Sequence, residues 1–161
     1  MRIIVMSDSH GSFNRVRRIV DANKDTAQMF LHLGDGVEEF EDVHHMYTST
    51  GLAFVAVKGN NDWGSNEQKV RTLFCAGKNI LLAHGDQYNV KWGLGEYTRA
   101  AREAKADIAL YGHTHCAQID YEDGLYLVNP GSVMDGHITP CSYLALDITP
   151  QGVVPVIREI K

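Results

Sequence analysis

The sequence has few cysteines, no long apolar run and no low-complexity tract, and each absence excludes a class of protein. The three cysteines, Cys75, Cys116 and Cys141, are odd in number and widely spaced, which argues against a disulfide framework and favours a reducing compartment. No apolar run approaches the ~18 residues of a membrane span, and residues 1–7 carry no signal-peptide cleavage site. The sequence therefore predicts a cytoplasmic protein with no membrane segment.

Basic charge is also scarce in this chain. It has 15 Lys and Arg against 20 Asp and Glu, which gives a formal charge of −5. The concentrated basic face of a dedicated nucleic-acid binder is absent. With 161 residues the chain can bury a full core, so a single domain over residues 1–161 is expected. A TIM barrel, which needs roughly 250 residues, is excluded.

Short apolar runs typical of strands alternate with stretches of helical periodicity over the first two thirds of the chain. The predicted strands here are residues 2–6, 28–33, 52–57, 70–75, 80–83 and 108–111, and the predicted helices are residues 12–22, 37–48 and 92–104. The last third is predicted to be mostly β, with strands at residues 117–121, 125–128, 143–147 and 153–160. We expect an α/β layered domain in which two sheets pack together with helices outside.

Polar residues gather just after the predicted strands, five times in succession. The five clusters are Asp8-Ser9-His10, Gly34-Asp35-Gly36, Gly59-Asn60-Asn61-Asp62, His84-Gly85 and Gly112-His113-Thr114-His115. Ligands of open α/β sheets bind outside the carboxyl ends of the strands, so the five clusters point to one site. A single cluster of this kind arises by chance in many chains, whereas five in a row would require five separate coincidences.

The residue types in these clusters indicate metal binding. Asp8 and His10 are two residues apart, as are His113 and His115, so on extended backbone each pair would project to one side. The candidate ligands are four histidines, two aspartates and an asparagine: Asp8, His10, Asp35, Asn60, His84, His113 and His115. This set suits Mn²⁺, Fe²⁺, Zn²⁺, Co²⁺ or Ni²⁺ better than Ca²⁺. Seven ligands exceed the needs of one tetrahedral ion, so we expect two divalent ions, Mn²⁺ foremost, sharing a bridging carboxylate.

In this order the motifs Asp8-x-His10, Gly34-Asp35, Gly59-Asn60-x-Asp62, His84-Gly85 and Gly112-His113-x-His115 resemble the signature of the calcineurin-like metallophosphoesterases. The short chain and the segment Asn129-Pro130-Gly131-Ser132 are similar to the small YfcE-type phosphodiesterase branch, which also includes the retromer subunit of the vacuolar sorting complex. The resemblance implies a four-layer α/β/β/α sandwich, two mixed β-sheets flanked by helices.

The resemblance also implies how the ligands are shared between the two ions. The first ion would take Asp8, His10 and His115; the second would take Asn60, His84 and His113; and Asp35 would bridge them. A hydroxide between the ions would then attack the phosphorus of a phosphodiester. The predicted catalytic residues are Asp35, Asn60, His84 and Asp62, the last either orienting a ligand or capping a loop.

The chain departs from the family pattern at Asn61, where many members have a histidine that assists the leaving group. Asparagine cannot act as a general acid, a contribution typically worth about 10²–10⁴-fold. Either the substrate has a good leaving group, or a metal-linked water or His137 takes over this role. We therefore expect a small diester substrate, nucleotide-like if Trp63 or Tyr88 stacks on a base, although packing on the core explains either aromatic equally well.

The motifs exclude several other hydrolase families and leave two other functions open. Asp8-Ser9-His10 is not the D-x-D of a haloacid-dehalogenase phosphatase, and the residues after His115 do not continue a metallo-β-lactamase motif. An H-x-H pair this late in the chain also excludes an amidohydrolase. A non-catalytic scaffold on the same fold and a phosphomonoesterase stay as alternatives, and the oligomeric state, a homo-oligomer included, is open. We expect His32 to be a packed core residue and His44 and His45 to lie at the surface or its boundary.

Overall fold

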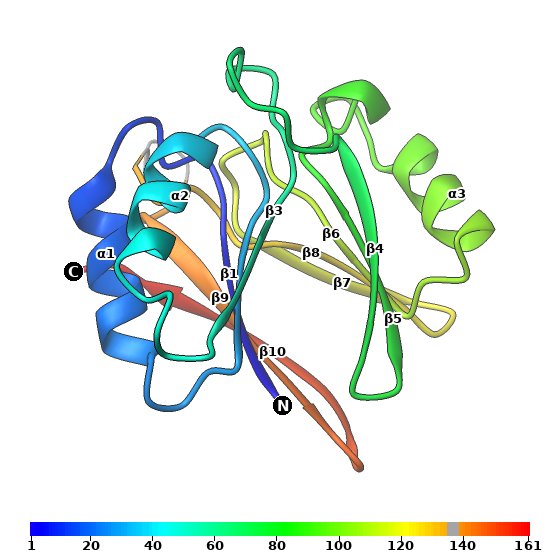
Figure 1. Cartoon of the computed structure of the whole chain (residues 1–161). Helices are drawn as coiled ribbons and strands as arrows, with labels where there is room; N and C mark the ends of the chain where they lie inside the picture. The colour runs from blue at the N-terminus through cyan, green and yellow to red at the C-terminus, as the bar shows by residue number, and fades with distance from the viewer. Residues whose placement is uncertain (135–138) are drawn as a thin grey trace.

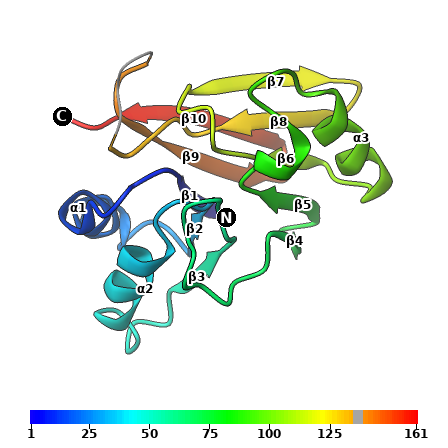
Figure 2. The ribbon, with the colours of Figure 1, turned by 90° about the horizontal axis from the view of Figure 1, so that it is seen from above.

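The computed structural model describes residues 1–134 and 139–161, which form four layers (Figure 1). Two five-stranded sheets pack face to face in the middle. The helices α1 (Phe13–Asn23) and α2 (Val37–His45) cover one side, and α3 (Gly95–Glu103) covers the other, as the view from above shows (Figure 2). The predicted four-layer α/β/β/α sandwich is therefore confirmed. No helix in the described ranges is long and apolar enough to cross a membrane.

Both sheets are mixed. The first has the order β10-β9-β1-β2-β3, and its strands are β1 (Arg2–Met6), β2 (Met29–His32), β3 (Ala53–Ala56), β9 (Ser142–Thr149) and β10 (Gly152–Glu159). In this sheet β1, β2 and β3 are parallel, whereas β9 is antiparallel to both β1 and β10. This pairing places the C-terminal hairpin beside the N-terminal strand.

The second sheet has the order β4-β5-β6-β8-β7. Its strands are β4 (Val70–Cys75), β5 (Lys78–Ala83), β6 (Ile108–Leu110), β7 (Gln118–Glu122) and β8 (Leu125–Asn129). The central strands β5, β6 and β8 are parallel, and the edge strands β4 and β7 pair antiparallel with their neighbours. A short 3-10 turn, η1 (Asp86–Tyr88), follows β5.

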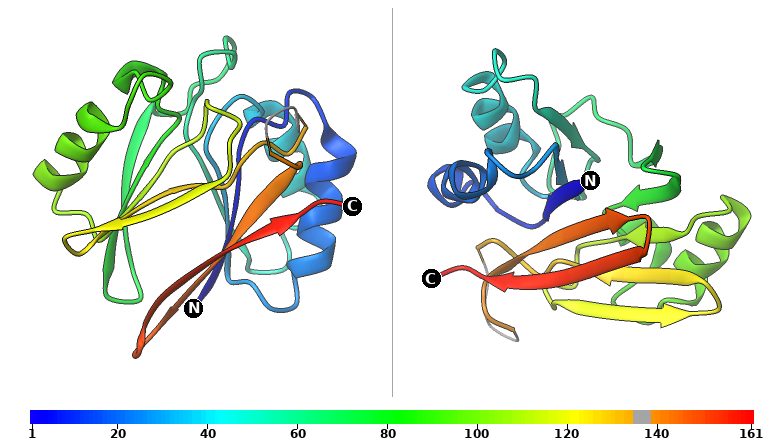
Figure 3. Two further views of the ribbon diagram at one scale, coloured as in Figure 1. Left: turned by 180° about the vertical axis from the view of Figure 1, so that it is seen from behind. Right: turned by 90° about the horizontal axis from the view of Figure 1, so that it is seen from below.

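Three apolar cores fill the spaces between the four layers. Strand β1 explains the pattern, because Ile3 and Val5 face the second sheet while Ile4 and Met6 face α1 and α2, and all four are fully buried. The helix α3 lies over the outer face of the second sheet (Figure 3). The third core, which includes the buried Tyr97, fills the space between them. Strands covered on both faces must be apolar throughout, which is why residues 2–6 form a continuous apolar run.

The predicted strands and helices all occur, and their ends shift by a few residues. The helix expected over residues 37–48 ends at His45, and the Thr50 hydroxyl then donates to the Tyr47 carbonyl 2.6 Å away within the turn. The helix expected from residue 92 begins at Gly95, because Gly93 holds a left-handed φ of 150°. The carboxyl ends of β1, β2, β3, β5 and β6 meet at one edge of the sandwich, at the top of Figure 1.

Candidate metal centre

Six of the seven predicted metal ligands meet at this edge in two groups. The first group is Asp8, His10 and His115, and the second is Asp35, His84 and His113. Within each group the potential ligand atoms lie within 4.8 Å of one another. The aspartates come from loops of the first sheet, whereas His84, His113 and His115 come from loops of the second, so the centre joins both sheets.

The distances between ligand atoms are those that a shared ion requires. In the first group, Asp8 Oδ1 lies 3.1 Å from His115 Nε2 and 3.8 Å from His10 Nε2, and the two ring nitrogens are 3.3 Å apart. Two ligands bound at about 2.1 Å to one ion with tetrahedral or octahedral angles are separated by about 3.0–3.4 Å. The side chains are therefore already close to the spacing that an ion would impose.

The second group has the same spacing and a defined imidazole orientation. His84 Nε2 lies 3.4 Å from Asp35 Oδ2 and 3.1 Å from His113 Nδ1. The opposite nitrogen, His84 Nδ1, donates to the Leu33 carbonyl at 2.8 Å, which fixes the tautomer and leaves the lone pair of Nε2 facing the centre. His84 Nε2 is also 3.9 Å from Asp8 Oδ1, which connects the two groups.

One buried oxygen supports the fit between these residues and a cation. Asp8 is fully buried, and among the described residues its Oδ1 has no well-aligned hydrogen-bond donor, although His115 Nε2 lies 3.1 Å away. Its other oxygen, Oδ2, accepts from the Ser7 hydroxyl at 2.6 Å and from the His113 N–H at 3.1 Å. A buried carboxylate oxygen without a donor is costly unless it binds a cation. The donor set and this oxygen together fit divalent metal ions.

Strained backbone marks the same residues. Of the nine non-glycine residues with positive φ in the described ranges, five are predicted ligands: Asp8 at 54°, His10 at 43°, Asp35 at 56°, His113 at 66° and His115 at 60°. The expectation that the D-x-H and H-x-H pairs lie on extended backbone is therefore wrong. The left-handed turns, and not strand alternation, bring each pair to one side. Such conformations cost free energy and are concentrated at functional sites.

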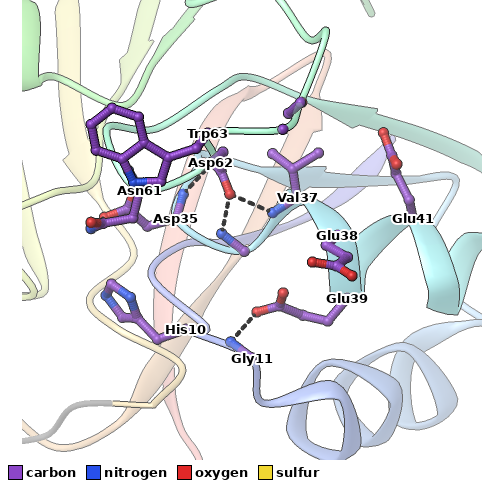
Figure 4. Close-up of a pocket in the computed structure, with 13 residues that line it drawn as sticks. His10, Gly11, Asp35, Val37, Glu38, Glu39, Glu41, Asn61, Asp62 and Trp63 are labelled. Carbon is purple, nitrogen blue, oxygen red and sulfur yellow. Dashed lines mark hydrogen bonds between the residues drawn. The ribbon is translucent and has the colours of Figure 1, made fainter.

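Asp62 holds the loop that carries Asp35. Its carboxylate accepts N–H groups from Asp35 at 2.7 Å, Gly36 at 2.9 Å and Val37 at 3.0 Å (Figure 4). It also accepts a fourth, from the Gly59 N–H at 2.8 Å. These bonds cap the N-terminus of α2 and join the β2 and β3 loops. Asp62 thus serves as a cap and also fixes the backbone of a ligand.

The two neighbouring asparagines behave differently. Asn60 is exposed in the turn after β3, and its predicted role as a ligand stays a prediction. Asn61 contacts Asp35 directly: its backbone N–H donates to Oδ1 at 2.8 Å and its side-chain amide donates to Oδ2 at 2.6 Å. Gly59 permits this approach, because a Cβ there would overlap the Asp35 carboxylate.

The surroundings keep both carboxylates ionised. Burial raises the pKa of Asp35, but His84 and Asn61 beside it outweigh burial and hold that pKa well below its ordinary value. Burial also raises the pKa of Asp8, and the adjacent His115 and His84 lower it overall. Burial, with His84 nearby, lowers the pKa of His113, which favours the neutral imidazole that a metal ion needs.

Sequence reasoning noted Asn129 and Ser132 as part of a motif but gave them no role at the centre. Asn129 donates to the Gly112 carbonyl at 2.9 Å and to the Thr114 hydroxyl at 3.0 Å, and Ser132 donates to the Asp8 carbonyl at 2.9 Å. The segment that begins at Asn129 therefore contacts both the loop of His113 and the loop of Asp8. The signal that could have found them is the place of Asn129-Pro130-Gly131-Ser132 directly after a predicted strand, which is also where the ligand clusters lie.

A pocket of about 800 Å³ opens beside the centre (Figure 4). Its lining includes the predicted ligands His10 and Asp35 together with Asn61, and it extends past Trp63 to the start of α2. Trp63 is 87% exposed at this pocket, so the alternative that it packs on the core is wrong. Asp8 and His84 on the inner side of the centre are fully buried, whereas His10 and His115 are 33% and 25% exposed, so the centre is accessible from this side.

The remaining histidines lie outside the two groups. His32 is fully buried, as predicted, although its partners are polar. His44 is partly buried and stacks on Phe54, and His45 is exposed, which confirms the expectation for this pair. His137, named as a possible substitute for the general acid, lies outside the described residues.

Comparison with known proteins agrees with this geometry. Over 133 residues the chain is 29% identical to the probable metallophosphoesterase YsnB of Bacillus subtilis, covering 83% of this chain and 75% of the relative. Over 159 residues it is 25% identical to phosphodiesterase MJ0936 of Methanocaldococcus jannaschii, covering 89% of this chain and 87% of the relative. The alignments with these relatives span most of the chain.

Solved structures share the fold. YfcE, a phosphoesterase from E. coli, superposes with a TM-score of 0.68 at 22% identity over the whole of both chains. Wild-type Vps29 of Entamoeba histolytica complexed with zinc gives a TM-score of 0.71 at 22% identity over 98% of each chain. The family model of the calcineurin-like phosphoesterase superfamily domain matches residues 1–151, and the chain belongs to this family.

Proposed function

We propose that this protein is a metal-dependent phosphodiesterase whose centre holds two divalent ions, Mn²⁺ foremost and Fe²⁺, Zn²⁺, Co²⁺ or Ni²⁺ as alternatives. The observation that carries the proposal is the pair of adjoining ligand groups beside an open pocket. Asp8, His10 and His115 would hold one ion, and Asp35, His84 and His113 the other, with Asn60 completing the second site and Asp35 bridging. When bound, the two ions would supply a hydroxide at neutral pH and offset the phosphate charge.

The residues of the chain would orient the reacting groups. The Leu33 carbonyl keeps His84 Nε2 directed at the centre, and Asp62 keeps Asp35 in place through its backbone. Asn61 donates both its backbone and its side-chain N–H groups to Asp35, so neither is a proton source for a leaving group. Diesters whose leaving alcohol departs without protonation are therefore the substrates that this site supports best.

The pocket supports a small substrate with one negative charge. Among its lining residues there is no Lys or Arg, whereas Glu38 and Glu41 on α2 face it with no ion-pair partner among the described residues. A polyanion would meet repulsion from these carboxylates, which supports the absence of dedicated nucleic-acid binding. The exposed indole of Trp63 offers a face on which a planar group, such as a nucleobase, could stack.

Two alternatives make different predictions. A phosphomonoesterase would benefit from a proton donor near the leaving group, and Asn61 does not provide one. A non-catalytic scaffold would have no use for two crowded groups of carboxylates and imidazoles, whose burial is costly. Because the Vps29 structure with this fold is complexed with zinc, metal binding alone does not separate scaffold from enzyme, whereas turnover does.

A cytoplasmic location is also proposed, since all three cysteines are free.

The test compares the rates at which the protein hydrolyses a diester, bis-p-nitrophenyl phosphate, and a monoester, p-nitrophenyl phosphate. The protein is stripped with a chelator and then refilled with Mn²⁺, and His84→Ala is compared with His45→Ala, a matched change at an exposed histidine. We expect metal-dependent cleavage that favours the diester, is lost in His84→Ala and is retained in His45→Ala. Absence of turnover with every divalent ion would contradict the proposal and favour the scaffold.

A further inference from the structure

A chain of three buried polar side chains lies directly beneath the loop that carries Asp8 and His10. It consists of Ser9, His32 and Glu39, whose exposed fractions are 0%, 0% and 8%. Ser9 lies in the loop after β1, His32 ends β2, and Glu39 lies in the first turn of α2. The chain therefore links three elements at the metal edge, yet none of its members belongs to either ligand group.

The direction of every hydrogen bond in this chain is determined. The Gly34 N–H donates to His32 Nδ1 at 3.2 Å, so the ring proton is on Nε2, which donates to Ser9 Oγ at 2.9 Å. The Ser9 hydroxyl in turn donates to Glu39 Oε1 at 2.6 Å, and the Gly11 N–H donates to the same oxygen at 2.7 Å (Figure 4). With each donor matched to an acceptor, the chain has a single arrangement.

The backbone leaves room for this chain. A Cβ at Gly36 would overlap Ser9 Oγ and would lie 2.7 Å from Glu39 Oε1 and 2.9 Å from His32 Cε1. Gly36 also has a φ of 156°, a conformation that side chains rarely permit. The absence of a side chain at this one position is what allows the three polar groups to meet.

The location of the chain indicates what it does. Ser9 and Gly11 flank His10 and are both anchored to Glu39, while His10 and Asp8 hold left-handed φ values of 43° and 54°. Left-handed backbone persists at such residues only where the surroundings fix it. A buried carboxylate and imidazole are seldom needed for stability, since apolar residues of similar volume often stabilise a fold as well. Fixing the strained ligand loop is the role that accounts for their position.

We propose that Ser9, His32 and Glu39 are positioning residues that set the affinity of the first metal site, the one formed by Asp8, His10 and His115. The inference rests on the metal centre of the proposed function, although not on the reaction at that centre. Groups that orient metal ligands through hydrogen bonds typically change metal affinity by about 10–100-fold when they are removed. The second site is held mainly by Asp62 and Leu33. It should therefore depend less on this chain, which contacts the loop of Asp35 through the bond from the Gly34 N–H to His32.

Calorimetric titration of the chelator-stripped protein with Mn²⁺ tests the proposal. We expect Ser9→Ala and Glu39→Ala to weaken one of two binding steps by about 10–100-fold, the same step that His10→Ala abolishes. Glu39→Gln keeps an acceptor oxygen for Ser9 and Gly11, so it should restore most of that affinity. The matched control is Tyr47→Phe, which removes a hydroxyl-to-carboxylate bond of the same 2.6 Å length far from the centre and should leave both steps unchanged.

The outcomes separate this inference from the proposed function. The inference would be overturned by unchanged Mn²⁺ affinity in folded Ser9→Ala, or by an equal loss of affinity at both binding steps. It would also be overturned if the wild type bound fewer than two ions or if Glu39→Gln did not restore the affinity. If Ser9→Ala does not fold, the Glu39→Ala and Glu39→Gln pair gives the same comparison. Two binding steps with the expected pattern but no diester turnover would uphold this inference and refute only the enzyme.

Discussion

At the scale of single residues, the centre depends on side chains that bind backbone rather than metal. Asp62 is the main example, because one carboxylate accepts four N–H groups from two loops. Three of these donors belong to the first residues of α2 and the loop before it, whose N–H groups have no partner inside the helix. The negative charge also interacts favourably with the helix N-terminus. Asp62 therefore connects loop geometry, helix stability and the position of Asp35.

Replacement of Asp62 by Asn tests this role. In Asp62→Asn an amide group would face backbone N–H donors in place of one oxygen, so at least one donor loses its partner. We expect the free energy of unfolding in the presence of chelator to fall by about 2–3 kcal/mol, measured by urea denaturation. Asp42→Asn, on the exposed face of α2, is the control and should change it by less than about 0.5 kcal/mol. Equal stability of the two variants would contradict the role of Asp62.

The candidate ligands and the supporting Asp62 could be predicted from sequence, whereas the buried residues beneath the loop of Asp8 could not. Asp8, His84 and His113 follow strands in motifs whose residue types themselves indicate metal binding. Ser9 and Glu39 have no such signal, because a serine in a loop and a glutamate in the first turn of a helix are common at the surface. Their function arises only when three segments distant in sequence meet, which is a property of the tertiary structure.

At the scale of elements, a polar contact joins the far end of α2 to α1. The Tyr47 hydroxyl donates to Asp21 at 2.6 Å across the helix pair, and the Tyr47 side chain is 7% exposed. This bond, followed by contact with Lys24 and Arg17, lowers the pKa of Asp21. Burial and Asp21 together raise the pKa of Tyr47 to about 12. The contact therefore makes the stability of the helical layer depend on pH at both extremes.

We expect Tyr47→Phe to lower the free energy of unfolding by about 0.5–1.5 kcal/mol near pH 7. The folded pKa of Asp21 lies below its unfolded value of about 3.9, so its contribution is present above that pH and is lost as pH falls further. The folded pKa of Tyr47 lies above its unfolded value, so its contribution is lost as pH rises from about 10 to about 12. Urea denaturation at pH 3, 7 and 11 should show the largest difference at pH 7; a pH-independent difference would contradict the assignment.

The order of strands and helices along the chain was predictable, because the elements of each layer have a distinct pattern of apolar residues in the sequence. The doubly covered β1 is a continuous apolar run, and α1 shows apolar residues at helical spacing, with Val16, Ile19 and Val20 buried. The strand order of the sheets has no local signature, since β9 returns to pair with β1 across more than a hundred residues. The alternation of predicted strands and helices indicated two packed sheets with helices outside, and the family resemblance supplied the full four-layer order.

At the scale of the whole molecule, the candidate metal centre joins the two sheets. Asp8 and Asp35 extend from the first sheet, whereas His84, His113 and His115 extend from the second. Between them the sheets share an apolar core that includes Val5, Leu31, Leu82 and Leu110. Bound ions would thus connect layers that the apolar core already holds together, and they would bind only the folded chain.

Added metal should therefore raise the thermal stability of the protein. A ligand that binds only the folded state contributes about 2.7 kcal/mol at 100 times its Kd, and a domain of this size gains roughly 3 °C in Tm per kcal/mol. Two ions at that level should raise the Tm of stripped protein by roughly 10 °C or more, as followed by circular dichroism. The shift should be smaller in His84→Ala, and an unchanged Tm in saturating Mn²⁺ would contradict a centre that joins the sheets.

The most direct test of the central claim combines metal counting with turnover in the same samples. Mn²⁺ is added stepwise to the stripped protein, and bound ions per chain and hydrolysis of bis-p-nitrophenyl phosphate are measured at each step. A two-ion phosphodiesterase predicts saturation at two ions, with turnover rising as the second ion binds. Turnover that is complete with one ion, or two bound ions without turnover, would contradict it.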